Sequence, residues 1–181
     1  MTFKTLLFIL IGFTTFLNPP KRAFYQIKMY HISSKDQETR LDAYLKDAYI
    51  PGMHRMGIKT IGVFKPVEAD TVSFGKLVYV LTPVKDLHQL LDIPKKLNQD
   101  AAYLSAGKDY IDAEYKNPPY TRIETIVLEA FSDAPQLALP KLNGPKSERI
   151  YELRSYEGHT EKIYQNKVQM FNAGGEIKLF S

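Results

Sequence analysis

Six side chains of types that bind small ligands recur in two strand-like stretches and beside one predicted helix end. They are Lys28, Tyr30, His54, Glu152, Arg154 and Tyr156. Phenol hydroxyls donate and accept hydrogen bonds, and cationic side chains hold anions. We therefore predict a polar cavity for a small anionic or phenolic ligand, with these six residues as its candidates. The alternative is that Lys28 and Arg154 pair internally with Glu152, because an unpaired buried charge is costly.

His54 is the titratable residue with the widest range of chemistry. It lies just past the predicted helix end at Pro51-Gly52, beside Arg55. An imidazole in that place could act as a general base or as a haem ligand. A solvated histidine, or one that caps the helix end, is the other interpretation. The catalytic residues therefore stay unassigned.

Several classes of site lack the residues they need. The chain has no cysteine, which excludes disulfides and thiol catalysis. No zinc-ligand spacing joins the four histidines, and no glycine-rich phosphate loop or G-x-S-x-G motif is present. The net charge of +4 is scattered along the chain. We therefore predict no metal, no cofactor and no nucleic-acid partner.

The elements that would position these residues follow the order βαββαβ. In turn they are a strand at 24–32, a helix from Ser34 to Pro51-Gly52, strands at 58–65 and 74–81, a helix from Asp86 to Tyr110 broken at Pro94, and a strand at 122–131. Capping-box spacings begin both helices, and apolar periodicity marks each element. This order is typical of an α+β, ferredoxin-like module, in which two helices cover one face of an antiparallel sheet. Strand alternation puts Lys28 and Tyr30 on one face, which we assign to the side away from the helices.

A second copy of the first strand and helix begins after a linker rich in proline and glycine at 132–147. We predict its strand at 149–156, its helix at 160–172, a stop at Gly174-Gly175 and the start of a further strand at 176–180. This second module, at 148–181, stops before it is complete. We expect a fragment, or a form completed by another chain.

Several of these stretches resemble the NIPSNAP family, in its two-domain bacterial type. The matching stretches are Tyr151–Tyr156, Asn166–Asn172, Gly174–Glu176, Ala48–Lys59 and Gly62–Pro66. The resemblance covers about residues 24–181 and implies the dimeric α+β barrel superfamily, in which two such sheets pack face to face. It therefore implies self-association, as a homodimer or as an intrachain pseudo-dimer. It supplies no agreed catalytic set.

These observations favour a NIPSNAP-like protein of unassigned activity that acts as a non-enzymatic binding or assembly module. The alternative is a small-molecule enzyme, similar to a monooxygenase, that works in the sheet–sheet cavity with His54 or Tyr30. Fold analogy alone supports the enzyme, because one fold hosts many functions.

The first residues have the pattern of an export signal. Lys4 precedes an apolar run from Leu6 to Phe13 that extends to Leu17. This length is short for a membrane span and suits a signal peptide at 1–17. The predicted location is therefore periplasmic or secreted, with the complete first module at 24–131. An uncleaved N-terminal membrane anchor and a buried N-terminal element are the alternatives.

Cleavage of this signal can be tested on exported material. We expect the intact mass of the periplasmic or secreted protein to lack residues 1–17, because signal peptides are removed on export. Mass spectrometry of the purified protein gives the answer directly. A mass that retains Met1 to Leu17 would rule out cleavage and favour the membrane anchor.

Overall fold

The computed structural model describes residues 21–145 and 148–179, so the predicted signal at 1–17 lies outside the described residues. Its elements are β1 (Phe24–His31), α1 (Lys35–Tyr44), the π-helix η1 (Leu45–Tyr49), α2 (Ile50–Arg55), β2 (Gly62–Phe64), β3 (Leu77–Val84), α3 (Leu87–Leu97), α4 (Ala101–Ala106), α5 (Lys108–Ile111), β4 (Arg122–Glu129), α6 (Glu161–Phe171) and α7 (Glu176–Leu179). None of the helices in these two ranges is both long and apolar enough to span a bilayer.

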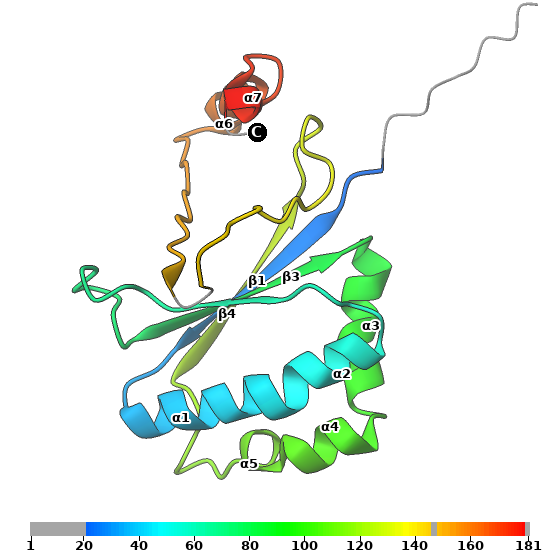
Figure 1. Cartoon of the computed structure of the whole chain (residues 1–181), viewed down its shortest axis with the longest axis vertical. Helices are drawn as coiled ribbons and strands as arrows, with labels where there is room; N and C mark the ends of the chain where they lie inside the picture. The colour runs from blue at the N-terminus through cyan, green and yellow to red at the C-terminus, as the bar shows by residue number, and fades with distance from the viewer. Residues whose placement is uncertain (1–20, 146–147, 180–181) are drawn as a thin grey trace, which may run out of the picture.

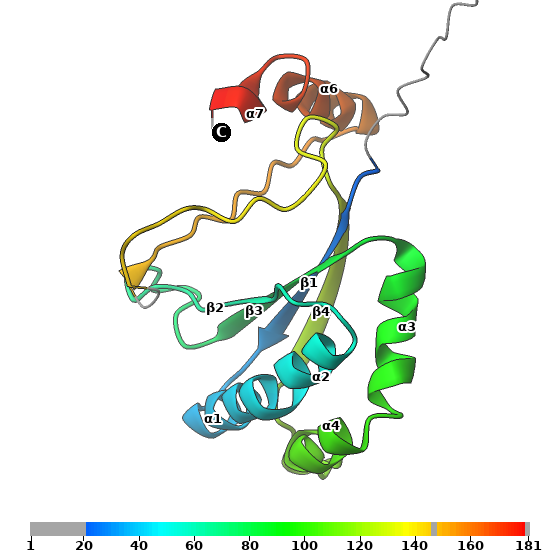
Figure 2. The same cartoon turned by 45° about the vertical axis from the view of Figure 1, so that its right-hand side comes forward.

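The four strands form one antiparallel sheet in the order β2-β3-β1-β4. Helices α1 to α5 cover one side of it, and residues 132–145 run on the other side (Figures 1 and 2). This is the ferredoxin-like α+β arrangement that the βαββαβ order predicts. Strand β1 lies in the middle, where Phe24 pairs with Val84 and Glu129, and His31 pairs with Leu77 and Arg122.

Both predicted capping boxes form. The Gln37 amide donates to Ser34 Oγ at 3.1 Å, and the Gln37 side chain accepts from the Ser33 amide at 2.8 Å. The Gln89 amide likewise donates to Asp86 Oδ1 at 2.8 Å. Each box satisfies amides that a helix start would otherwise leave unbonded, so the helices begin where the sequence places their caps.

The first helix continues through Pro51-Gly52, which we expected to end it. It runs on as η1 and α2 to Arg55, so His54 lies inside the helix. Proline has no amide to donate to the carbonyl four residues back. The π-helical turn immediately before it changes the local hydrogen-bond pattern, and such wide turns let a helix absorb an irregularity without stopping.

Three other predicted boundaries differ. Helix α3 passes through Pro94 and ends at Leu97, so the break comes at 98–100, where Asp100 caps α4. Strand β2 covers only Gly62–Phe64 of the predicted 58–65, and its pairing with β3 begins at Gly62 opposite Leu81. Strand β3 covers Leu77–Val84 rather than the predicted 74–81. None of these differences alters the order of elements.

The core lies between the sheet and the helices. Val78 and Val80 of β3 are fully buried against Leu41, Ala48 and Met53 of the first helix. Alternate residues of β3 are buried, as expected for a strand with one face in the core. Apolar packing therefore closes the helix face over β1 and β3, whereas Val127 of β4 on the same face is 46% exposed.

Six aromatic rings form a tyrosine cluster within this core, namely Tyr30, Tyr44, Tyr49, Tyr103, Tyr110 and Tyr120. The rings of Tyr44 and Tyr110 stack with centroids 3.6 Å apart. The hydroxyl groups of Tyr44 and Tyr103 are hydrogen-bonded at 2.9 Å. Burial raises the pKa of the Tyr30, Tyr44 and Tyr110 phenols far above the ordinary value of 10.0.

The C-terminal part differs from the predicted second module. Residues 149–158 form no strand, and Glu176–Leu179 is the helical turn α7 rather than a strand. Helix α6 forms as predicted, and Thr160 caps it with a 3.3 Å bond from the Ile163 amide. A strand needs a hydrogen-bonding neighbour, and none of the four sheet strands pairs with residues 149–158.

The core assignment predicts a large stability loss at Leu41. The Leu41→Ala variant removes a fully buried side chain and should lower the free energy of unfolding by about 2–5 kcal/mol. The matched control is Leu91→Ala on α3, where the side chain is 64% exposed and the loss should stay below about 1 kcal/mol. Urea denaturation followed by circular dichroism measures both. Equal losses would contradict the core described above.

Candidate functional site

The strand register divides the sheet into two faces. Residues that pair directly across strands point to the same side, and successive residues alternate. Tyr30 pairs with Val78 and Ile123, and Lys28 pairs with Val80 and Thr125. Because Val78 and Val80 are buried in the core, Lys28 and Tyr30 lie on the helix face. Our assignment of these two residues to the opposite side is therefore wrong.

Tyr30 is part of the core rather than a donor on an open surface. Its side chain is only 1% exposed. Its ring meets the edges of Tyr110 and Tyr120, with centroids 6.5 and 5.7 Å apart. In an alternating strand, tyrosine can be assigned to the polar positions because of its hydroxyl. Its ring nevertheless has enough apolar area to pack in a core. That mixed character is why the two faces of β1 were exchanged in the prediction.

Lys28 is half-buried beside the tyrosine cluster. Its Nζ lies 5.1 Å from the centroid of the Tyr49 ring, and among the described residues no carboxylate pairs with it. Burial lowers the pKa of the Lys28 amine below the ordinary value of 10.5, because desolvation disfavours the charged form. The predicted internal pairing of Lys28 with Glu152 does not form.

His54 lies on the outer side of α2 and is exposed. Its backbone carbonyl accepts hydrogen bonds from the Gly57 amide at 3.0 Å and from Lys59 Nζ at 3.3 Å. These contacts belong to the end of the helix. Within the described residues no hydrogen bond or ring contact joins the His54 imidazole to Lys28 or Tyr30.

Glu152, Arg154 and Tyr156 come together as a local group away from the other three candidates. Arg154 Nη2 donates to Glu152 Oε2 at 2.8 Å, and this bond lowers the pKa of the Glu152 carboxyl. Glu152 and then Tyr156 raise the pKa of the Arg154 guanidinium. The Tyr156 ring packs against Phe171 of α6 at 5.3 Å. The six candidates are thus divided among the helix face, the outside of α2 and the 149–158 segment.

The other side of the sheet has a different character, and we call it the open face. It consists of Tyr25, Ile27, Met29 and His31 of β1, Phe64 of β2, Leu77, Tyr79, Leu81 and Pro83 of β3, and Arg122, Glu124, Ile126 and Leu128 of β4. Ile126 and Leu128 are each 43% exposed. The 149–158 segment touches the open face where Tyr151 meets the Phe64 ring at 5.2 Å. Most of the face is apolar.

One end of the open face carries charge. His31 Nε2 and Glu124 Oε1 are 2.7 Å apart, and Arg122 Nε lies 3.3 Å from the same oxygen. His31 is the last residue of β1 and pairs directly with Arg122, the first residue of β4. Tyr79 lies nearby on β3, and burial raises the pKa of its phenol, with further contributions from Asp70 and Glu124. We call His31, Arg122 and Glu124 the polar triad.

The sequence prediction missed the polar triad for a specific reason. His31 belongs to no local motif, and Arg122 and Glu124 lie about ninety residues away in the sequence. The available signal was strand parity, because His31, Met29 and Ile27 share a face. With the parity assigned correctly, a histidine at the end of an apolar face would have been a candidate.

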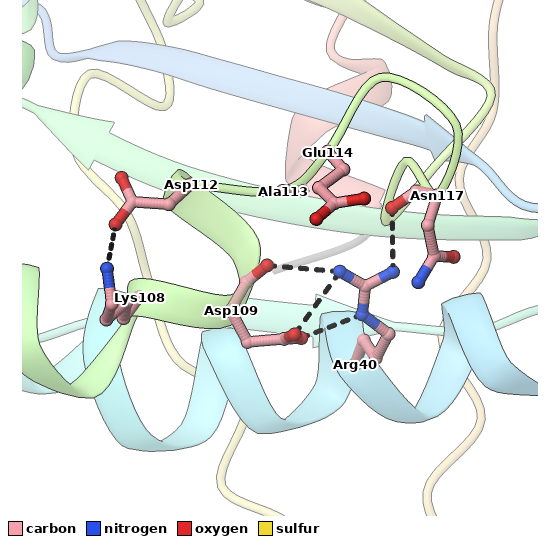
Figure 3. Close-up of a pocket in the computed structure, with 7 residues that line it drawn as sticks. All are labelled: Arg40, Lys108, Asp109, Asp112, Ala113, Glu114 and Asn117. Atoms are coloured by element: carbon pink, nitrogen blue, oxygen red, sulfur yellow. Dashed lines mark hydrogen bonds and ion pairs between the residues drawn. The ribbon is translucent and has the colours of Figure 1, made fainter.

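A surface hollow of about 420 Å³ is lined by Arg40, Lys108, Asp109, Asp112, Ala113, Glu114 and Asn117 (Figure 3). Arg40 Nε donates to Asp109 Oδ2 at 2.7 Å, and Nη1 donates to the Asn117 carbonyl at 3.0 Å. Lys108 pairs with Asp112 at 2.5 Å. These bonds join α1 to α5 and to the loop that follows α5. The side chains that line the hollow therefore have a structural role.

The depressed pKa of Lys28 predicts how stability changes with pH. Below its folded pKa the buried ammonium destabilises the fold, and this cost disappears as pH rises toward 10.5, where the unfolded chain also loses the proton. We expect Lys28→Met to be more stable than the wild type near neutral pH, with the difference shrinking as pH rises. Urea titrations at several pH values measure it. Lys46→Met, at an exposed site on η1, is the control and should show no such trend. A constant difference for Lys28→Met would contradict the burial of its amine.

Comparison with known proteins gives structural matches only. No protein-family model matches the chain, and no curated protein matches it. A crystal structure of a NIPSNAP family protein of unknown function from Agrobacterium tumefaciens is 15% identical, covers 61% of this chain and 89% of its own, and has a TM-score of 0.46. A second crystal structure of that protein is 14% identical, covers 63% and 99%, and has a TM-score of 0.47.

A third crystal structure, of an ethyl tert-butyl ether D (EthD) family protein from Bacillus halodurans, is 14% identical. It covers 60% of this chain and 98% of its own, with a TM-score of 0.38. Matches with identities and TM-scores this low transfer no function. The chain is similar to NIPSNAP family proteins, as its sequence motifs indicate.

Proposed function

We propose that this protein is a non-enzymatic binding and assembly module that self-associates through the open face of its sheet. One observation carries the proposal, namely the apolar side chains of that face. Ile126 and Leu128 of β4 are exposed, and most of the others are half-buried. A sheet buries its two faces against other layers, and here helices cover only one of them. A second copy of the chain offers the same apolar face, so two copies can pack isologously about a two-fold axis.

The size of the face sets how tight such a dimer should be. Three of its strands have eight residues each. With β2 only three residues long, a rise of about 3.3 Å per residue and strands about 4.8 Å apart, the face covers roughly 430 Å². Two copies would then bury about 860 Å² in total, which is below the roughly 1,000 Å² of a stable specific interface. We therefore expect a dimer that dissociates on dilution.

The enzyme alternative has weaker support. It relied on His54 or Tyr30 beside a sheet–sheet cavity, whereas Tyr30 is buried beneath the helices and His54 lies on the outside of α2. The apolar character of the open face supports assembly more directly than chemistry. Export from the cytoplasm remains part of the proposal, and the pattern at residues 1–17 supports it.

Charged substitutions on the open face should abolish the dimer. We expect Ile126→Glu combined with Leu128→Glu to give a monomer at concentrations where the wild type is dimeric, because each carboxylate would be desolvated in the interface. Sedimentation velocity across a wide range of protein concentration measures the equilibrium. A loss of about tenfold or more in dimer affinity corresponds to about 1.4 kcal/mol.

The control is Leu91→Glu, which places the same charge at an exposed leucine on α3. This variant should dimerise like the wild type. A wild-type chain that stays monomeric throughout would overturn self-association and favour a second sheet from the same polypeptide. A dimer that survives the double substitution would place the interface elsewhere.

A further inference from the structure

We propose that the polar triad binds an aromatic hydroxy acid, with the ligand's carboxylate on Arg122, its hydroxyl on His31 and its ring on the open face. The inference rests on the proposed dimer, because the second copy would supply the other wall of the site. It concerns residues that the predicted cavity did not include. Three features carry it: the unbonded Nδ1 of His31 within the described residues, the free donors of Arg122 and the apolar side chains beside them.

The contact with Glu124 determines which nitrogen of the His31 ring carries a proton. A carboxylate only accepts hydrogen bonds, so Nε2 of His31 carries the proton in the 2.7 Å contact with Glu124 Oε1. In the neutral imidazole the other nitrogen, Nδ1, is then an acceptor. Among the described residues Nδ1 has no hydrogen-bond partner. A ligand hydroxyl can bond this nitrogen in either form of the ring, because a hydroxyl donates to an unprotonated Nδ1 and accepts from a protonated one.

Arg122 offers the complementary donors. Within the described part of the chain its guanidinium makes only the ion pair from Nε to Glu124 at 3.3 Å, and its side chain is 67% exposed. An arginine has five N–H donors in a planar fork, so both terminal nitrogens remain for a ligand. That fork matches the two oxygens of a carboxylate. An anion is thus the natural ligand on this side.

The pairing of the two residues lets one small ligand reach both. His31 and Arg122 are direct partners on neighbouring strands, so their side chains stand side by side on the open face. A benzene ring that carries both a hydroxyl and a carboxylate provides one polar group for each. Met29, Leu77 and Tyr79 lie next to the polar triad on the same face and provide apolar contact for the ring. A simple ligand with these features is 3-hydroxybenzoate.

Three probes separate the contributions. We expect 3-hydroxybenzoate to bind more tightly than benzoate, which lacks the hydroxyl, and more tightly than phenol, which lacks the carboxylate. The hydroxyl should contribute about threefold to tenfold, and the charged contact about tenfold or more. Titrations followed by the NMR signal of the Met29 methyl group give the dissociation constants. The same samples are analysed by sedimentation for oligomeric state.

Two substitutions assign each contact to its partner. Arg122→Gln should remove the advantage of 3-hydroxybenzoate over phenol and leave its advantage over benzoate. His31→Phe keeps an aromatic ring, and it should remove only the advantage over benzoate. A purely structural role for these residues would weaken all probes alike. Arg55→Gln, which disrupts an ion pair with Asp100 on the helix side, is the control and should change none of the ratios.

The outcomes distinguish the inference from the proposed dimer. A dimer that binds no probe, or binds all three equally in every variant, overturns the ligand site and leaves the assembly proposal standing. A monomer that shows the variant-specific ratios overturns the dimer and supports the site on a single sheet. A monomer that binds no probe overturns both.

Discussion

Strand β1 determines this structure because it is hydrogen-bonded along its whole length on both edges. All eight of its residues are paired with β3 and with β4. The two-residue period of a strand then assigns every side chain of the sheet to one of two environments at once. Tyr30 and Val78 go to the helices together, and His31 and Arg122 go to the open face together. A shift of one residue would exchange the core and the surface.

The consequence is a sheet with one side packed against helices and one side without them. On the helix face, valines and the tyrosine cluster pack against α1 to α5, and the bonds from Arg40 to Asp109 and Asn117 hold the outer elements together. On the open face, apolar side chains give way to the polar triad where β1 ends and β4 begins. Assembly and ligand binding are thus proposed for the same surface, and its polar end distinguishes it from a uniform apolar patch.

Sequence patterns predicted the elements of the first module well, because the signals are local. The capping residues Ser34 and Asp86 begin helices at the expected places, and the order of strands follows from βαββαβ. Local sequence patterns do not indicate which face of β1 packs against the helices. Lys28 and Tyr30 look polar in an alternating pattern, and only contact with Tyr49, Tyr110 and Tyr120 shows that they lie on the helix face. The strand expected at 149–156 failed for a related reason, since a strand requires a partner that no local pattern supplies.

The tyrosine cluster also gives this protein an optical property. The chain has twelve tyrosines and no tryptophan, so its near-ultraviolet absorption and emission come from phenol rings. Burial holds the pKa values of Tyr30, Tyr44, Tyr49 and Tyr110 above 10.0. In alkaline solution the exposed phenols therefore ionise first, while the unfolded chain can release protons that the core retains. The free energy of unfolding must therefore fall as pH rises past 10. The buried phenols ionise, with the accompanying shift in their ultraviolet absorption, only as the core opens.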